Sequence, residues 1–258
     1  MTIWEMGIPD FDFRLMDPLG QVILIIILLV TMGCELPNDT IEHQKLIGDT
    51  VDVRAMKFYP SGEILSVYHQ KDGVKHGQET EYFASGGKKS EGVWYRGFKT
   101  GWFRYFFENG KLRTLREYII LDHPDLRERV SYPNQIINFD EHGDSLSTGS
   151  FYIRLQKTSD TIVQGTPFYV RVTLVEPMFD EMYVILCDKD YPPSSSEVTC
   201  DTFGVKNYRL IFSPRSSHLG ENIIEGMVVN FENYIDEGGR SKSKSATIYF
   251  SLSYYITK

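Results

Sequence analysis

The residues best suited to chemistry in this sequence form two short clusters of histidine with carboxylates. Imidazole nitrogens and carboxylate oxygens at such close spacing are donors that a transition metal uses. Clusters of this kind are more often solvated loop residues, so we predict no metal site. The clusters are DHPD, with Asp122, His123 and Asp125, and DEHGD, with Asp140, His142 and Asp144.

Nucleophilic catalysis has no support in the residue pattern. Cys187 and Cys200 have no histidine nearby in the sequence, and no G-x-S-x-G elbow is present. The CDKDY segment offers Asp188 and Asp190, too few for a calcium loop, which needs five or more converging oxygens. The sequence therefore predicts a protein that is not an enzyme and has no cofactor.

The composition is that of a folded protein rich in sheet. Of the 258 residues, 41% are hydrophobic and 14% aromatic, and flat rings pack well on a pleated surface. The formal net charge is -8, whereas nucleic-acid binding needs a cationic surface that displaces counterions. We therefore predict no nucleic-acid partner.

The N-terminus has the pattern of an export signal. Nine consecutive apolar residues run from Val22 to Val30, fewer than the roughly 20 that a membrane-spanning helix needs. The Gly33-Cys34 pair resembles the lipobox of bacterial lipoproteins. That resemblance implies a signal peptide over 1–33, a lipid on Cys34, a polar tether over 34–48, and a place in the bacterial cell envelope, periplasmic or surface-exposed. An uncleaved short anchor or a signal without lipid is the alternative.

The two remaining cysteines form an even pair in a chain that we expect to be exported. In an oxidising compartment Cys187 and Cys200 can close a loop of twelve intervening residues. Such a loop closure stabilises a fold by roughly 3 kcal/mol. Two independent reduced thiols are the alternative.

An internal repeat of 24 residues runs through the middle of the chain. GVKHGQETEYFASGG, from Gly73, aligns with GFKTGWFRYFFENGK, from Gly97. Three glycines, a lysine and a pair of aromatics coincide, which chance would rarely produce. One period earlier, the aromatic pair Phe58-Tyr59 and Gly62 fall on the same positions.

The residue types of the repeat predict stacked hairpins. Each PSG, ASGG or ENG segment places glycine where a tight hairpin turn needs a positive φ. We expect the Gly-x-x-x-Gly stretches to make the turns at the opposite ends of the strands. A single hairpin is too small to bury its own aromatics, so neighbouring repeats should form a continuous antiparallel β-meander.

This pattern resembles the MORN-repeat variant family, which includes proteins described as YwqK-type antitoxins. The resemblance covers about residues 50–120, with a weaker continuation through RVSYPNQIINFDEHGD. It implies a non-catalytic β-meander used for protein contacts, which we place at 49–145. An antitoxin or immunity role is the weaker implication.

The C-terminal region, 146–258, has a different pattern of short alternating strands. FYVRVTL directs Phe168, Val170, Val172 and Leu174 to one face, and the last strand alternates from Ile248 to Ile256. Six or seven short strands separated by turn signals predict an immunoglobulin-like β-sandwich. The fold class is therefore all-β.

The function that follows is that of a membrane-anchored scaffold for an unknown protein partner. Aromatic residues of the meander are the candidate contacts, because an uncovered sheet face presents rings to a ligand or to a partner strand. Rings that only pack the repeats together are the alternative, and a cell-wall glycan is the alternative ligand. The candidate contact residues are Trp94, Tyr95, Trp102, Tyr105 and Phe107.

Overall fold

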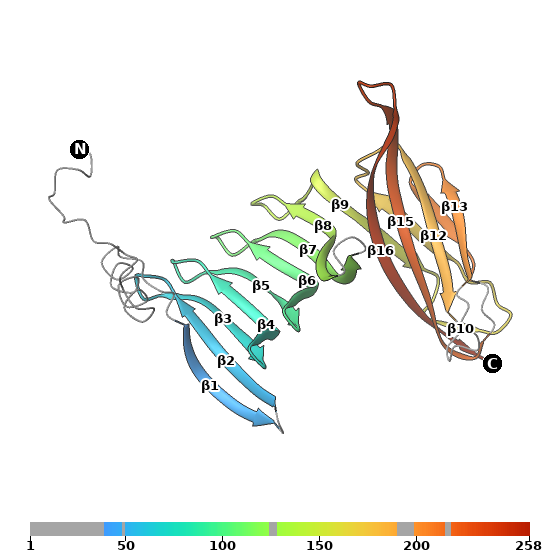
Figure 1. Ribbon diagram of the computed structural model, residues 1–258. Coiled ribbons are helices and arrows are strands. Elements are labelled where there is room, and N and C mark those ends of the chain that lie inside the picture. The colour runs from blue at the N-terminus through green and yellow to red at the C-terminus, as the bar shows by residue number, and fades with distance from the viewer. Residues whose placement is uncertain (1–38, 48–49, 124–127, 190–198, 215–217) are drawn as a thin grey trace, which may run out of the picture.

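The computed structural model describes residues 39–47, 50–123, 128–189, 199–214 and 218–258. Every regular element in these ranges is a β-strand, which confirms the predicted all-β class (Figure 1). None of the described residues lies in a helix that could cross a membrane. The predicted signal peptide, Cys34 and residues 35–38 of the predicted tether lie outside the described residues. The rest of the tether differs from the prediction, because Asp39–Ile47 forms a strand that pairs with Thr50–Phe58.

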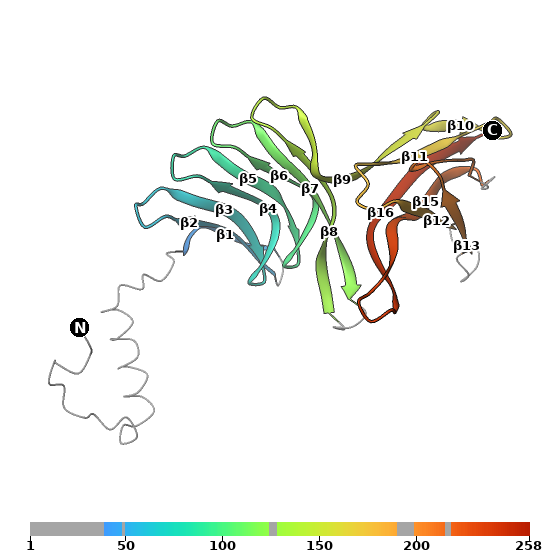
Figure 2. The same cartoon turned by 90° about the horizontal axis from the view of Figure 1, so that it is seen from above.

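The first nine strands form an antiparallel meander in which each strand pairs with the next along the chain. Figure 1 shows them as a row of steps, and Figure 2 shows the same row as a curved fan. The predicted meander is therefore confirmed. Its strands are β1 (Asp39–Ile47), β2 (Thr50–Phe58), β3 (Ile64–Lys71), β4 (Val74–Tyr82), β5 (Lys88–Tyr95), β6 (Phe98–Phe106), β7 (Leu112–His123), β8 (Glu128–Phe139) and β9 (Ser145–Lys157).

One hairpin turn recurs at the period of the repeat. Tyr59 donates its N–H to Glu63 O, and Gly62 donates to Tyr59 O. The same two bonds form 24 and 48 residues later, at Phe83 and at Phe107. Each turn has a glycine at positive φ, as the aligned glycines predicted. The turn at Asp140 repeats the bonding, which extends the turn pattern into the weaker continuation.

The Gly-x-x-x-Gly stretches differ from the prediction. Gly73 and Gly97 do lie in two-residue turns, where Asp72 and Arg96 also have positive φ. The second glycine of each stretch, Gly77 or Gly101, instead lies inside β4 or β6 at a β-bulge. Gly77 and Gly101 have positive φ at these bulges, as Gly73 and Gly97 have in the turns, so a glycine by itself does not distinguish the two.

The sheet continues through β9 into the C-terminal region. The first part of β9 pairs with β8, and its residues from Tyr152 to Lys157 pair with β11. Eleven strands thus share one sheet, ending with β11 (Val170–Val175) and β14 (Arg209–Phe212). The predicted boundary at 145/146 falls inside β9.

A second sheet of five strands faces the end of the first. Its order is β10-β16-β15-β12-β13, and only β10 and β16 pair in parallel among the described strands. The strands are β10 (Thr161–Val163), β12 (Glu181–Lys189), β13 (Thr199–Val205), β15 (Gly220–Ile235) and β16 (Ser241–Thr257). Short strands were predicted, with DEGGRSKSKS as a turn between two of them, but β15 and β16 have 16 and 17 residues. The SKSKS part of that segment belongs to β16 and not to the turn.

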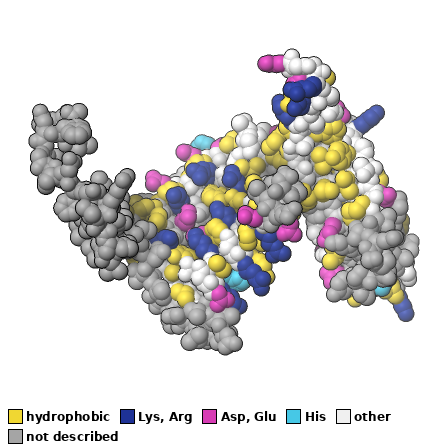
Figure 3. Space-filling model, viewed as in Figure 1, with side chains coloured by type: hydrophobic (Ala, Val, Ile, Leu, Met, Phe, Trp, Pro, Cys, Tyr) yellow, Lys and Arg dark blue, Asp and Glu magenta, His cyan; other side chains and the backbone are white. Residues whose placement is uncertain are grey.

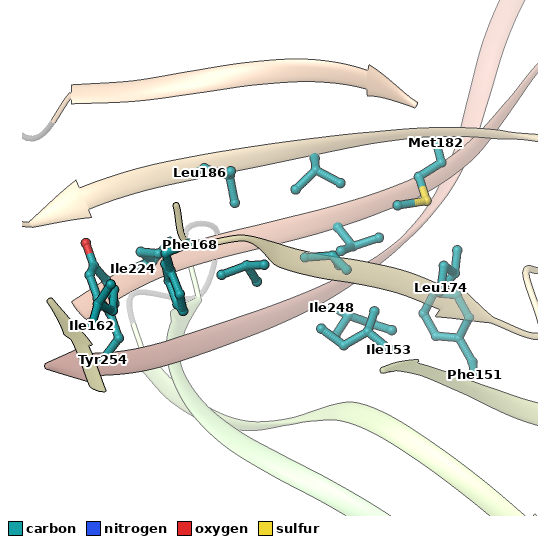
Figure 4. Packing of buried hydrophobic residues seen from close by; sticks show 14 of the residues in the cluster. Phe151, Ile153, Ile162, Phe168, Leu174, Met182, Leu186, Ile224, Ile248 and Tyr254 are labelled. Carbon is teal, nitrogen blue, oxygen red and sulfur yellow. The ribbon is translucent and has the colours of Figure 1, made fainter. Parts of the chain in front are cut away.

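The main hydrophobic core lies between these two sheets (Figure 4). Phe168, Val170, Val172 and Leu174 are all buried, as the alternation predicted, and they meet Val184, Ile224 and Ile248 of the second sheet. The meander before β8 has no second layer of this kind, and its only other core cluster among the described residues is Val53, Ala55 and Tyr68.

Side chains of the first sheet close the edge of β16 that faces the meander. Asn134 donates Nδ2–H to Tyr249 O and accepts the Tyr249 N–H on Oδ1, both at 2.8 Å. The Tyr132 hydroxyl donates to Thr247 O at 3.0 Å. Asn134 is the extra residue of a bulge in β8, and a bulge re-aims its side chain. Both Figure 1 and Figure 2 show β8 beside β16.

Candidate functional site

The structure divides the predicted contact aromatics between the two faces of the meander. Successive residues of a strand point to opposite faces, so Trp94 and Tyr95 separate on β5. Register links Trp94 to Lys99, and Tyr105 to Ser90, which puts Trp94 and Tyr105 on one face. Tyr95 and Trp102 lie on the other. Phe107 belongs to a hairpin turn and is half-buried.

On the face of Trp94, two lysines of the repeat alternate with aromatic rings. Lys75 Nζ lies 5.1 Å from the ring centre of Tyr68 and 4.6 Å from that of Trp94. Lys99, one period later, lies 4.9 Å from Phe103 and 5.3 Å from Tyr118. We call these residues the lysine–aromatic ladder: Tyr68, Lys75, Trp94, Lys99, Phe103, Tyr105 and Tyr118. A cation over a ring contributes about 0.5–2 kcal/mol.

A buried carboxylate fixes one step of this ladder. Glu79 is 5% exposed, and it accepts a hydrogen bond from Trp94 Nε1 at 2.6 Å on Oε2. Its other oxygen pairs with Lys75. A buried charge is costly unless it is paired, so Glu79 holds both the indole and the ammonium in place.

Two tyrosines of the ladder share a hydrogen bond. The hydroxyl oxygens of Tyr105 and Tyr118 lie 3.3 Å apart. Burial raises the pKa of Tyr105, and its bond to Tyr118 raises it further. Burial opposes ionisation of Tyr118 too, but hydrogen bonds from Tyr105 and Arg116 and the charge of Lys99 outweigh burial and lower its pKa. The pair therefore has one phenol that ionises early and one that ionises late.

The opposite face carries large apolar side chains in contact with water. Tyr95 packs against His76 with ring centres 5.4 Å apart, and a Cβ on Gly97 would lie 4.0 Å from Val74 Cβ, so these residues are neighbours. Four apolar residues of this face are exposed, and we call them the apolar patch: Val74 (45% exposed), Val93 (47%), Tyr95 (44%) and Trp102 (39%).

Charged and apolar side chains are interspersed over the meander. Figure 3 shows Lys and Arg among hydrophobic and acidic side chains along these strands. The rings of the ladder are occupied by the protein's own lysines. The apolar patch, in contrast, projects from strands that no second sheet covers among the described residues, so it is the surface better placed for a partner.

Cys187 and Cys200 stand directly opposite each other on β12 and β13, and a disulfide joins them. They lie on the outer face of the second sheet, away from the core. The pair is far from the meander repeats in sequence and takes no part in the patch or the ladder.

The histidine–carboxylate clusters have structural roles where the structure describes them. Asp140 Oδ1 accepts backbone N–H groups of His142, Gly143 and Asp144 at 2.8–3.0 Å. The bond from Asp144, with the other two, lowers the pKa of Asp140.

In the other cluster Asp122 pairs with Arg129 at 3.2 Å, whereas Asp125 lies outside the described residues. Within the described ranges no three potential metal ligands gather.

Comparison of the chain with protein-family models, with curated proteins and with solved structures finds no match. The geometry of the meander and the chemistry of its two faces therefore carry the functional argument.

Sequence reasoning missed two kinds of residue. Lys75 and Lys99 were aligned as repeat positions but were not recognised as partners of the rings; their spacing beside aromatics was the available signal. No sequence pattern indicated the role of Asn134, because its partner Tyr249 is 115 residues away.

Proposed function

We propose that this protein is a non-enzymatic, lipid-anchored component of a bacterial cell envelope, and that its meander binds a partner protein through the apolar patch. The observation that carries the proposal is the exposure of Val93, Tyr95 and Trp102 on strands that no other described sheet covers. Exposed apolar residues that gather on one surface commonly mark interaction sites. Aromatic residues are also enriched among the residues that dominate binding energy at interfaces.

The repeat chemistry supports a scaffold role. We propose that the meander is a member of the MORN-repeat variant family, on the strength of the 24-residue period and its recurrent turns. We also propose that the C-terminal region is an immunoglobulin-like module that acts as a spacer or binds a second ligand. Its two facing sheets and their core support that proposal.

The anchor rests on sequence, since Cys34 lies outside the described residues. Mass spectrometry of the mature N-terminus from the native host tests it. We expect a chain that begins at Cys34 with a diacylglycerol mass increment. A chain that retains residues before Cys34, or one without lipid, would contradict the anchor but not the patch.

Photo-crosslinking in the native host tests the patch. A photoreactive amino acid is placed at position 93 or 102, and at Tyr169 as a control that is 51% exposed on the C-terminal part. We expect one adduct of defined size from positions 93 and 102 and none from 169. Absence of an adduct from both patch positions, or the same adduct from all three, contradicts the proposal.

A glycan-binding function is the second candidate, favoured by the exposed rings of Tyr95 and Trp102, since such rings can serve as a platform for a sugar. Sedimentation of the purified protein with insoluble cell-wall glycan distinguishes it. If the wild-type protein sediments with the glycan and the Trp102→Ala variant does not, the glycan is favoured over a protein partner.

A further inference from the structure

A cleft of about 530 Å³ lies between the meander and the outer face of the second sheet. One wall is β7, which contributes Glu117 and Ile119. The floor consists of outward residues of the second sheet, including Ile185, Met227 and Tyr249. The volume is within the range of small-molecule sites, which are concave and mostly apolar with a few polar groups.

The floor of the cleft is set by strand register. Ile185, Met227 and Tyr249 are direct partners across β12, β15 and β16. In the next row, Cys187, Glu225 and Ser251 are partners in the same way. Paired residues point to the same face of a sheet, so an apolar row lies beside a row that contains a carboxylate.

Glu117 is the carboxylate that is fixed at this cleft. Its Oε2 accepts hydrogen bonds from Asn134 Nδ2 at 2.6 Å and from Gln135 Nε2 at 2.7 Å. Both bonds fall on the same oxygen, and no described residue donates to Oε1. Asn134 also binds the Tyr249 backbone, so one side chain positions Glu117 relative to the floor.

The charge of the cleft has one sign. Among the residues that the structure describes, its lining contains Glu117 and Glu225 and no lysine, arginine or histidine. Glu225 has an interaction of its own. We take Glu117 as the acceptor for a ligand, because both of its donors bind Oε2. A fixed carboxylate beside apolar side chains is complementary to a cation that carries an apolar body.

We propose that this cleft binds a small organic ammonium ion with an apolar chain or ring. The ammonium group donates to Glu117 Oε1, and the apolar body covers Ile119, Ile185 and Met227. The site is separate from the apolar patch, and the failure of either proposal leaves the other standing.

Calorimetric titration of the full-length protein with octylammonium tests the proposal, with octanoate and octan-1-ol as probes of equal chain length. We expect saturable 1:1 binding of octylammonium only. Glu117→Gln removes the charge and should weaken binding at least about tenfold, because a hydrogen bond to a charged group is lost. Glu221→Gln, at an exposed position on β15 outside the cleft lining, should change it less than about twofold.

Met227→Lys is the second variant, because it leaves Glu117 and its bonds intact. A tethered ammonium in the cleft should abolish octylammonium binding while the circular dichroism spectrum is kept. Absence of saturable binding to the wild-type protein overturns the proposal, as does equal affinity for octan-1-ol. Unchanged binding in Glu117→Gln or in Met227→Lys also overturns it.

Discussion

The ring of Phe103 covers Gly92 on the neighbouring strand so closely that a Cβ at position 92 would lie 2.4–2.5 Å from three ring carbons. One repeat earlier, Tyr68 occupies the place of Gly92, and Glu79 occupies the place of Phe103. In one repeat the ring is Phe103, across from Gly92. In the repeat before it, the ring is Tyr68 on the other strand, across from Glu79. Each ring needs a small or polar residue across from it.

Gly92→Ala tests this relationship. The added methyl group has to displace the Phe103 ring, and overpacking of this kind costs about 1–3 kcal/mol. We expect that loss in the free energy of unfolding measured by chemical denaturation. Gly204→Ala is the control, because nothing lies within 4 Å of a Cβ there. Equal stability of the two variants would contradict the packing.

The lysine–aromatic ladder predicts that Lys99 stabilises the meander. Lys99→Met keeps an unbranched side chain over the rings but removes the charge. The free energy of unfolding should fall by about 0.5–2 kcal/mol. Lys89→Met, at an exposed lysine of the same sheet, should change it by less than about 0.5 kcal/mol. A loss of the same size in both variants would argue against an attraction between Lys99 and the rings.

The hydroxyl pair predicts an early-ionising tyrosine. The pKa of Tyr118 is lowered, so its ionised form is favoured in the folded state. Its stabilising contribution appears as pH rises through the folded pKa and is complete above the ordinary tyrosine value of about 10. The raised pKa of Tyr105 has the opposite sign and reduces stability above that value.

Ultraviolet titration of tyrosinate measures this directly. The folded protein should show one phenol that ionises below the ordinary range, and Tyr118→Phe should remove that phase. Tyr105→Phe should shift it to higher pH, because the hydrogen bond that favours the phenolate is lost. A titration of Tyr118→Phe with the early phase intact would show that another tyrosine is responsible.

Asn134 predicts coupling between the meander and the second sheet. Asn134→Ala removes two bonds to the Tyr249 backbone, and the Tyr249 N–H then lacks its partner. The free energy of unfolding should fall by about 1–3 kcal/mol, and the Tyr249 amide should exchange with solvent faster. Asn233→Ala, at an exposed position of β15, should leave that exchange rate unchanged. Slow exchange in both variants would refute the coupling.

The meander could be predicted because it depends on turns and side chains that are close together in the sequence. Glycines with positive φ recur at 24 residues beside paired aromatics, and a single hairpin cannot bury those aromatics, so stacking follows. The bulges at Gly77 and Gly101 were not predictable in the same way. A glycine that makes a turn and a glycine that makes a bulge have the same conformational requirement, and only cross-strand register distinguishes them.

The distribution of the candidate aromatics between the two faces of the meander could be predicted only in part. Alternation along a strand separates Trp94 from Tyr95 and Trp102 from Tyr105. It does not say which face is covered by lysines and which is open, since that depends on pairing between strands. The cleft depends on contacts between β8 and β16, which no local pattern encodes.

We propose that a partner covers the apolar patch in the cell. Covalent labelling of tyrosine and tryptophan side chains, compared between the purified protein and intact cells of the native host, tests it most directly. We predict that labelling of Tyr95 and Trp102 falls in cells while labelling of Trp94, Tyr105 and Tyr169 stays the same. Equal labelling of Tyr95 and Trp102 in the two preparations would show that no partner covers the patch.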